Sequence, residues 1–369
     1  MSMNINANTL NYYIQNAQIS FELLKSKIKN LEEFLSGEKQ PTFSQLSEIA
    51  KKINVPTGLL LLDEPINIED KRLDFRTINS NELEGMSEEL RDTIIEMEIK
   101  QDFLSKEIHE KLEFIGKYSI HHDVDYIAKI IREKLGLPLF FQNEAGKNPL
   151  NYLRDKINVI GVFVFFNGKV KDNTHRPLSL NEFRGFVLLN DKAPIIFINQ
   201  KDTKAGQLFT LVHELVHIFV GSEEIFNIVD TGDYQFDRTE AFINKVTAEI
   251  LVPKEILLSL DLTDTKKIAN KFKVSEFVII RRLLDLNKIS LSEYHEKVSE
   301  LKAFFDQIPR IESNGGDYKN NINFRIDKRF FNYIESAIRR DRISYTDAFN
   351  IIGVGIKGYK ALREGNGYE

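Results

Sequence analysis

The sequence contains no cysteine in 369 residues. Without thiols the chain can form neither disulfides nor thiolate metal sites, so any metal ion must be held by histidine, aspartate or glutamate. Long apolar runs are also missing, because the longest one, Val159 to Phe166, is about half of the roughly 20 residues that cross a bilayer. Met1 to Asn16 lacks the basic start and apolar stretch of a secretory signal. We therefore expect a soluble, cytoplasmic protein with no membrane contact.

A strong excess of charge of one sign is missing as well. The 50 Lys and Arg residues nearly balance the 55 Asp and Glu residues, so no global field would draw the protein onto nucleic acid. Any nucleic-acid contact must therefore be local. The chain is long enough for two or three domains, since single cores rarely grow beyond about 250 to 300 residues.

Apolar periodicity and chain breaks divide the sequence into four regions. Residues 1–68 predict a small helical domain, and 69–118 a linker with a long helix from Met86 to Leu112. Residues 119–300 predict a mixed domain, and 301–369 a basic helical region interrupted at Gly315-Gly316.

Within the mixed domain, β-branched and aromatic runs predict three strands, at 157–166, 183–189 and 195–199. Two helices should follow, at 205–220 and 239–251. The predicted fold class is therefore α+β, with a small mixed sheet flanked by helical N- and C-terminal domains.

The first of these two helices carries His213-Glu214-Leu215-Val216-His217. Residues four apart lie on one helical face, so His213 and His217 can bind one ion. Catalytic zinc sites have three protein ligands and a water molecule, and Glu214 lies where it can take the proton of that water and pass it to a leaving amine. The apolar flanks predict a buried helix, in which unpaired polar groups are costly. The alternative is a pair of hydrogen-bonded core histidines.

A third metal ligand is expected downstream of this motif. The three-histidine pattern needs Gly at 220 and His at 223, but the sequence has Val220 and Glu223, which excludes that class. The next helix offers Glu240 at its start, with Glu223 and Glu224 as rivals. Asn244, one turn after Glu240, either orients that residue or a substrate group, or is an ordinary polar residue.

Other polar residues have weaker claims to a role. His175, Tyr234 and Arg238 are candidates for stabilising a developing oxyanion. The histidines at 109, 121, 122 and 295 have charged or polar neighbours in the sequence and are expected at the surface.

These residues resemble a known family. The stretch Phe209 to His217, followed by Glu240, Asn244 and the Ile250-Leu251-Val252-Pro253 ending, resembles the ImmA/IrrE family of metallopeptidases. Two N-terminal segments, Ser36 to Thr42 and Asp74-Phe75-Arg76-Thr77, are similar to the XRE-type helix-turn-helix and connector that precede the peptidase domain in long members. The resemblance covers most of the chain.

The resemblance implies a zincin-like, gluzincin-type peptidase domain that holds Zn²⁺ through His213, His217 and Glu240, with Glu214 as catalytic base. The 183–199 region would hold an extended substrate by β-addition. The family implies a zinc endopeptidase whose protein substrate is a DNA-binding repressor or an antitoxin-like partner, and whose activity controls gene expression.

The two ends of the chain differ in charge. Residues 1–70 hold 6 Lys, no Arg and 9 acidic residues, which favours protein docking or autoregulation over DNA reading by the first domain. Basic residues outnumber acidic ones from Asn320 to Glu369. There, the stretch from Ser344 to Leu362 is either a solvated basic face or a second helix-turn-helix. Ala269 to Leu286 also looks like a helix-turn-helix, but we assign it to the peptidase domain.

Two other functions fit the same sequence. The chain can be a helix-turn-helix transcription regulator whose metal site is structural or sensory. It can also be a toxin-antitoxin component that uses a peptidase fold for binding.

Overall fold

The computed structural model describes residues 3, 5–15, 21–53, 55, 57–62, 64–65, 86–221, 225–226, 238–306 and 317–368. The chain forms two compact units, Met1–Arg76 and Thr77–Glu369. The proposed connector Asp74 to Thr77 and the Gly315-Gly316 break lie outside the described residues. The four region boundaries of the sequence analysis therefore stay a prediction.

The first unit is helical, as its sequence pattern predicts. Its apolar positions Leu46, Ile49 and Ile53 are buried in one core. Thr42 starts the fourth helix with a capping box that it forms with Gln45. The elements are α1 (Ala7–Gln15), α2 (Phe21–Lys27), α3 (Leu31–Ser36), α4 (Phe43–Lys52) and the 3₁₀ helix η1 (Thr57–Leu61).

The second unit is built on a mixed sheet with strand order β1-β3-β2-β4. The strands are β1 (Phe163–Asn167), β2 (Gly185–Leu188), β3 (Ile195–Asn199) and β4 (Ile225–Phe226). β1 and β3 are parallel, whereas β2 is antiparallel to both β3 and β4. The predicted α+β class and small mixed sheet are confirmed.

Two details of the sheet differ from the sequence prediction. The strand expected from residue 157 begins only at Phe163, because Ile157 and Val159 belong to the last turn of α8 (Pro149–Val159). Asn148 caps this helix and Pro149 occupies its first turn, so the helix runs into the apolar stretch that resembles a strand. The short strand β4 had no signal in the sequence pattern.

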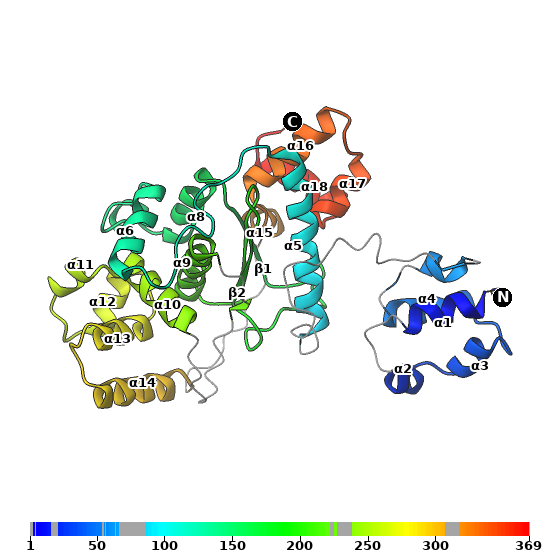
Figure 1. The fold of residues 1–369 in the computed structure, drawn as a ribbon, viewed down its shortest axis with the longest axis horizontal. Coiled ribbons are helices and arrows are strands. Elements are labelled where there is room, and N and C mark those ends of the chain that lie inside the picture. The colour runs from blue at the N-terminus through cyan, green and yellow to red at the C-terminus, as the bar shows by residue number, and fades with distance from the viewer. Residues whose placement is uncertain are drawn as a thin grey trace. The chain divides into compact units, whose positions relative to one another are not determined.

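Strands β1, β2 and β3 are buried on both faces, which explains why these strands are apolar at nearly every position. Val164, Phe166 and Ile196 share one core with α6 (Val124–Leu135), α8, α9 (Lys204–Val220) and α10 (Arg238–Leu251). The alternate residues, including Phe163, Phe165 and Phe197, share the second core with α5 (Glu88–Glu107) and the C-terminal helices. Figure 1 shows the two helical layers on opposite sides of the strands.

The remaining helices complete these layers. They are α7 (Gln142–Ala145), α11 (Lys254–Leu258), α12 (Thr265–Phe272), α13 (Glu276–Asp285), α14 (Leu291–Asp306), α15 (Tyr318–Arg325), α16 (Lys328–Arg339), α17 (Tyr345–Ile352) and α18 (Ile356–Gly365). Helices α12 and α13 contribute to the first core, as expected for the 269–286 segment. No helix in the described parts of the chain is both long and apolar enough to span a membrane.

Candidate metal centre

Helix α9 brings the three polar residues of the motif into the centre of the first core. Thr203 starts the helix by accepting a hydrogen bond from the Gly206 backbone N–H, and Gly221 ends it. His213, Glu214 and His217 are each 0% exposed. Such burial requires partners for these groups, because a buried polar group without one is costly.

Glu240, in the first turn of α10, meets the two histidines. The Nε2 atoms of His213 and His217 are 3.0 Å apart. Glu240 Oε2 lies 3.3 Å from His213 Nε2, and Oε1 lies 3.0 Å from His217 Nε2. The structure therefore brings together His213, His217 and Glu240, and among the described residues these form the group able to hold a metal ion.

The spacing of these atoms fits a tetrahedral zinc ion. Ligands that lie about 2.0 to 2.2 Å from zinc are roughly 3.3 to 3.5 Å from one another at tetrahedral angles. The three separations, 3.0, 3.3 and 3.0 Å, are close to that edge length. Two imidazoles and one carboxylate are also a donor set that catalytic zinc sites use. Glu240 retains 26% side-chain exposure, so the group is reachable from solvent.

The protonation states of the group also suit metal binding. Burial lowers the pKa of His213 to about 4, although hydrogen bonds with Glu240 and Asn244 oppose this shift. Its imidazole is therefore neutral at neutral pH and has a lone pair to donate. Burial alone would raise the pKa of Glu240, but its hydrogen bonds and charge interactions with the two histidines hold that pKa below its usual value. Glu240 is thus a carboxylate.

Glu214 lies beside the backbone of β2. A Cβ atom added at Gly185 would be 3.3 Å from Glu214 Oε1, 2.5 Å from Thr210 Cγ2 and 2.8 Å from the Phe197 carbonyl oxygen. Only glycine allows α9 to approach the strand this closely. Sequence reasoning missed Gly185, although a glycine at the start of an apolar strand is a signal for such an approach.

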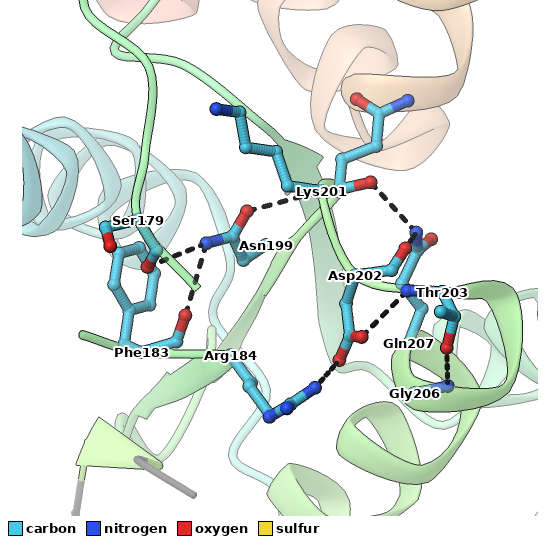
Figure 2. A network of polar contacts seen from close by, with 10 residues as sticks. Ser179, Phe183, Arg184, Asn199, Lys201, Asp202, Thr203, Gly206 and Gln207 are labelled. Carbon is cyan, nitrogen blue, oxygen red and sulfur yellow. Dashed lines mark hydrogen bonds and ion pairs between the residues drawn. The ribbon is translucent and has the colours of Figure 1, made fainter. Parts of the chain in front are cut away.

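A polar network fixes the start of α9 against the sheet. Figure 2 shows Asp202, which accepts hydrogen bonds from the Arg184 side chain and from the Thr203 backbone N–H. Gln207 donates from its side chain to the carbonyl oxygens of Gln200 and Asp202. These contacts join β2, the loop after β3 and the first turns of α9. The helix that carries both histidines is therefore anchored at its N-terminal end.

The far end of α10 is held by buried cationic and amide side chains. Arg132 donates to the carbonyl oxygens of Glu249 and Ile250, and Gln142 donates to that of Leu251. Arg282 forms an ion pair with Glu249. These donors satisfy the carbonyl groups that a helix end leaves free, which gives a structural reason for the Ile250-Leu251-Val252-Pro253 ending.

The other candidates from the sequence are placed as follows. The Asn244 side chain lies close enough to His213 to oppose the lowering of its pKa, a position suited to orienting that ring. Arg238 and His175 are exposed. Glu223, Glu224 and Tyr234 lie outside the described residues. The histidines at 109, 121, 122 and 295 are exposed, as expected.

Comparison with known proteins supports a metallopeptidase. Residues 160–284 match the family model Peptidase_M78, described as the IrrE N-terminal-like domain. This range contains β1 to β4, α9, α10 and all four residues of the candidate site. No curated protein and no solved structure matches the chain.

Proposed function

We propose that the protein is a zinc-dependent endopeptidase that cuts a regulatory protein, either a DNA-binding repressor or an antitoxin-like partner. The observation that carries the proposal is the convergence of His213, His217 and Glu240 within 4.8 Å, with Glu214 adjacent on the same buried helix. The match of residues 160–284 to a peptidase family supports it. The cytoplasm, where such regulators act, is the proposed location.

The residues have distinct roles in this proposal. His213, His217 and Glu240 hold the zinc ion, which when bound would polarise the scissile carbonyl and acidify a water molecule. Glu214 accepts a proton from the attacking water molecule while the water oxygen forms a bond to the carbonyl carbon. It then passes that proton to the amide nitrogen, and the C–N bond breaks. Asn244, whose side chain interacts with His213, orients the ring of that ligand.

An extended substrate would lie along the antiparallel side of the sheet. Gly185, which adjoins Glu214, pairs with Phe226 of β4, and Phe186 pairs with Ile225. A peptide added at this side would continue the β2 and β4 ladder through backbone hydrogen bonds. The catalytic carboxylate lies directly beside that ladder.

The Glu214→Gln variant tests the proposal. General-base catalysis contributes about 10²- to 10⁴-fold to a rate, so cleavage should fall by that factor while zinc content is unchanged. The substrate is found by labelling new protein N-termini in cells that express either the wild-type chain or the variant. Proteins encoded beside the gene are the first candidates.

A matched control separates chemistry from folding. Lys245 is exposed on α10, so Lys245→Gln should leave both zinc content and cleavage unchanged. New N-termini that are equally abundant with the wild-type chain and with Glu214→Gln would contradict the proposal.

A second candidate function is a transcription regulator with a structural or sensory metal site. The helix pair α17 and α18 favours it, because two helices joined by a short glycine-containing turn recur in DNA-binding proteins. In that case Glu214→Gln would keep full regulatory activity in cells, whereas a peptidase would lose it.

A further inference from the structure

Two of the C-terminal helices, α17 (Tyr345–Ile352) and α18 (Ile356–Gly365), are joined by a short turn. Helix α17 ends at Gly353, whose φ of +81° is in the left-handed region, and α18 starts after Gly355. The connection is thus three residues, Gly353 to Gly355, and the middle one, Val354, is buried. A turn of this length with glycine is typical of the helix pair that reads DNA.

Tyr359 of α18 fixes the orientation of the helices. Its ring contacts Phe349 of α17 at 5.2 Å and Phe331 of α16 at 5.8 Å between centroids. Its hydroxyl donates to the buried carboxylate of Glu335 on α16. Helices α16 to α18 are therefore one packed three-helix unit.

Helix α18 has one packed face and one open face. A Cβ atom at Gly358 would be 2.8 Å from Ile322 Cδ1 and 2.9 Å from the Tyr318 hydroxyl, so this side is pressed against α15. On the other side Ile356 is 61% exposed, and Lys360 is exposed. Lys357 is also exposed and lies at the edge of the packed side, with its Nζ atom 5.2 Å from the centre of the Tyr318 ring. These three residues lie in the first two turns, the part of a recognition helix that contacts base edges.

The charge around this open face is positive. Residues 317–368 contain ten basic and six acidic residues. Two of the acidic residues, Asp327 and Glu335, are buried, and Glu364 is paired with Lys319 at 2.6 Å. The exposed basic residues near the helix pair are Lys328, Arg339, Arg340, Lys357 and Lys360, and the exposed acidic residues of the region are Asp317, Asp341 and Asp347. Arg342 is exposed as well, but it forms an ion pair with Glu107 at 2.5 Å.

We propose that α18 is a recognition helix that enters the major groove of duplex DNA. Lys357 and Lys360 would contact guanine edges or phosphates, and Ile356 the methyl group of thymine. Arg339 and Arg340, at the end of α16, would contact the flanking phosphates. A-form RNA has a major groove too narrow for a helix, so B-form DNA is the predicted ligand. The inference does not depend on peptidase activity.

Fluorescence anisotropy with the full chain tests this inference. The probes are a labelled mixed-sequence DNA duplex and the RNA duplex of the same sequence, over about 50 to 200 mM salt. The wild-type chain should bind the DNA, and its affinity should fall steeply with salt. Lys357→Glu/Lys360→Glu should weaken DNA binding at least tenfold and flatten the salt dependence. Lys357→Arg/Lys360→Arg should restore binding.

The control is a variant with the same change of charge elsewhere. Lys147 and Lys266 are exposed on the first-core side of the second unit, so Lys147→Glu/Lys266→Glu should change affinity less than twofold. Circular dichroism establishes that each variant is folded. Three outcomes would overturn the inference: no salt-dependent DNA binding by the wild-type chain, equal weakening by the two glutamate variants, or equal affinity for duplex RNA.

Discussion

The two faces of the sheet each bury a pair of polar residues four positions apart on a helix, but the pairs differ in kind. On the α5 face, Lys100 Nζ and Glu96 Oε1 form an ion pair at 2.6 Å, and the lysine is 0% exposed. On the α9 face, His213 and His217 are equally buried and their facing Nε2 atoms converge on Glu240.

This difference explains why the histidine pair is a candidate metal site and the Glu96–Lys100 pair is not. Glu96 and Lys100 satisfy each other, since burial lowers the pKa of Lys100 but the neighbouring carboxylate opposes the shift. Two imidazoles and one carboxylate bring several electron pairs together, and a cation satisfies them all. Both pairs have the same spacing and burial. What distinguishes an ion pair from a candidate metal site is therefore whether the two side chains satisfy each other or need a cation.

Among the changes that test this comparison, removal of the Glu240 side chain should have the largest effect, which we expect on zinc content and cleavage. Loss of a residue that only supports a metal ligand typically costs about 10- to 100-fold in metal affinity, and loss of a direct ligand should cost more. Glu240→Ala should therefore lose zinc and cleavage together. Metal analysis after purification without chelator checks this, with Lys245→Ala as the control on the same helix. Full zinc content in Glu240→Ala would remove that residue from the ligand set.

Lys100→Met should be the most destabilising change on the opposite face. It leaves Glu96 as a buried, unpaired carboxylate, which costs about 3 to 5 kcal/mol. The double variant Glu96→Leu/Lys100→Met should recover most of that loss, because apolar residues of similar volume often replace a buried pair at little cost. Denaturant unfolding measures both variants. Equal stability of the single and double variants would show that the pair is not coupled.

Gly185→Ala should affect activity more than overall stability. The added methyl group would meet Thr210, the Phe197 carbonyl and Glu214, and overpacking of this kind costs about 1 to 3 kcal/mol. We expect cleavage to fall about tenfold or more with zinc retained, because Glu214 is displaced and the ligands are not. Gly58→Ala, where a Cβ has no atom within 4 Å, is the control. Loss of zinc from Gly185→Ala would mean that the strand positions the histidines as well.

Arg184→Gln should have the smallest effect. Its partner Asp202 is nearly buried, but the Arg184 side chain is 29% exposed, and ion pairs that water can reach contribute about 1 kcal/mol or less. Thermal unfolding should detect a small loss of stability with zinc content unchanged. A loss above about 3 kcal/mol would place this pair with Glu96 and Lys100, as a buried pair whose disruption is severe.

The parts of the structure that the sequence predicts are those with a local signal. The limits of α9 and α10 follow from apolar periodicity, Gly221 and Pro253. The meeting of Glu240 with the two histidines follows from helix positions and from the family resemblance. The sequence does not show on which face of the sheet Phe163 and Phe165 lie, because strands buried on both faces lack an alternating apolar and polar pattern.

Contacts between distant segments had no such signal. Arg132 holds the end of α10 from 117 residues away, and Gly185 adjoins a glutamate on a later helix. The C-terminal region looked separate because it is basic, but Phe330 and Ile334 are buried in the second core. The same helices have a charged exposed face and an apolar buried face. The overall composition averages over both faces, so it does not reveal that these helices pack on the sheet.

That shared core has a consequence for substrate selection. Because α16 to α18 pack on the same sheet as the candidate site, a DNA-bound molecule would hold its peptidase centre at a fixed distance from its binding sequence. A repressor on an adjacent sequence would then be present at a high effective concentration, on the order of millimolar for closely linked sites. Under those conditions weak recognition of the repressor by the peptidase domain would be sufficient, and location on the chromosome would supply the selectivity.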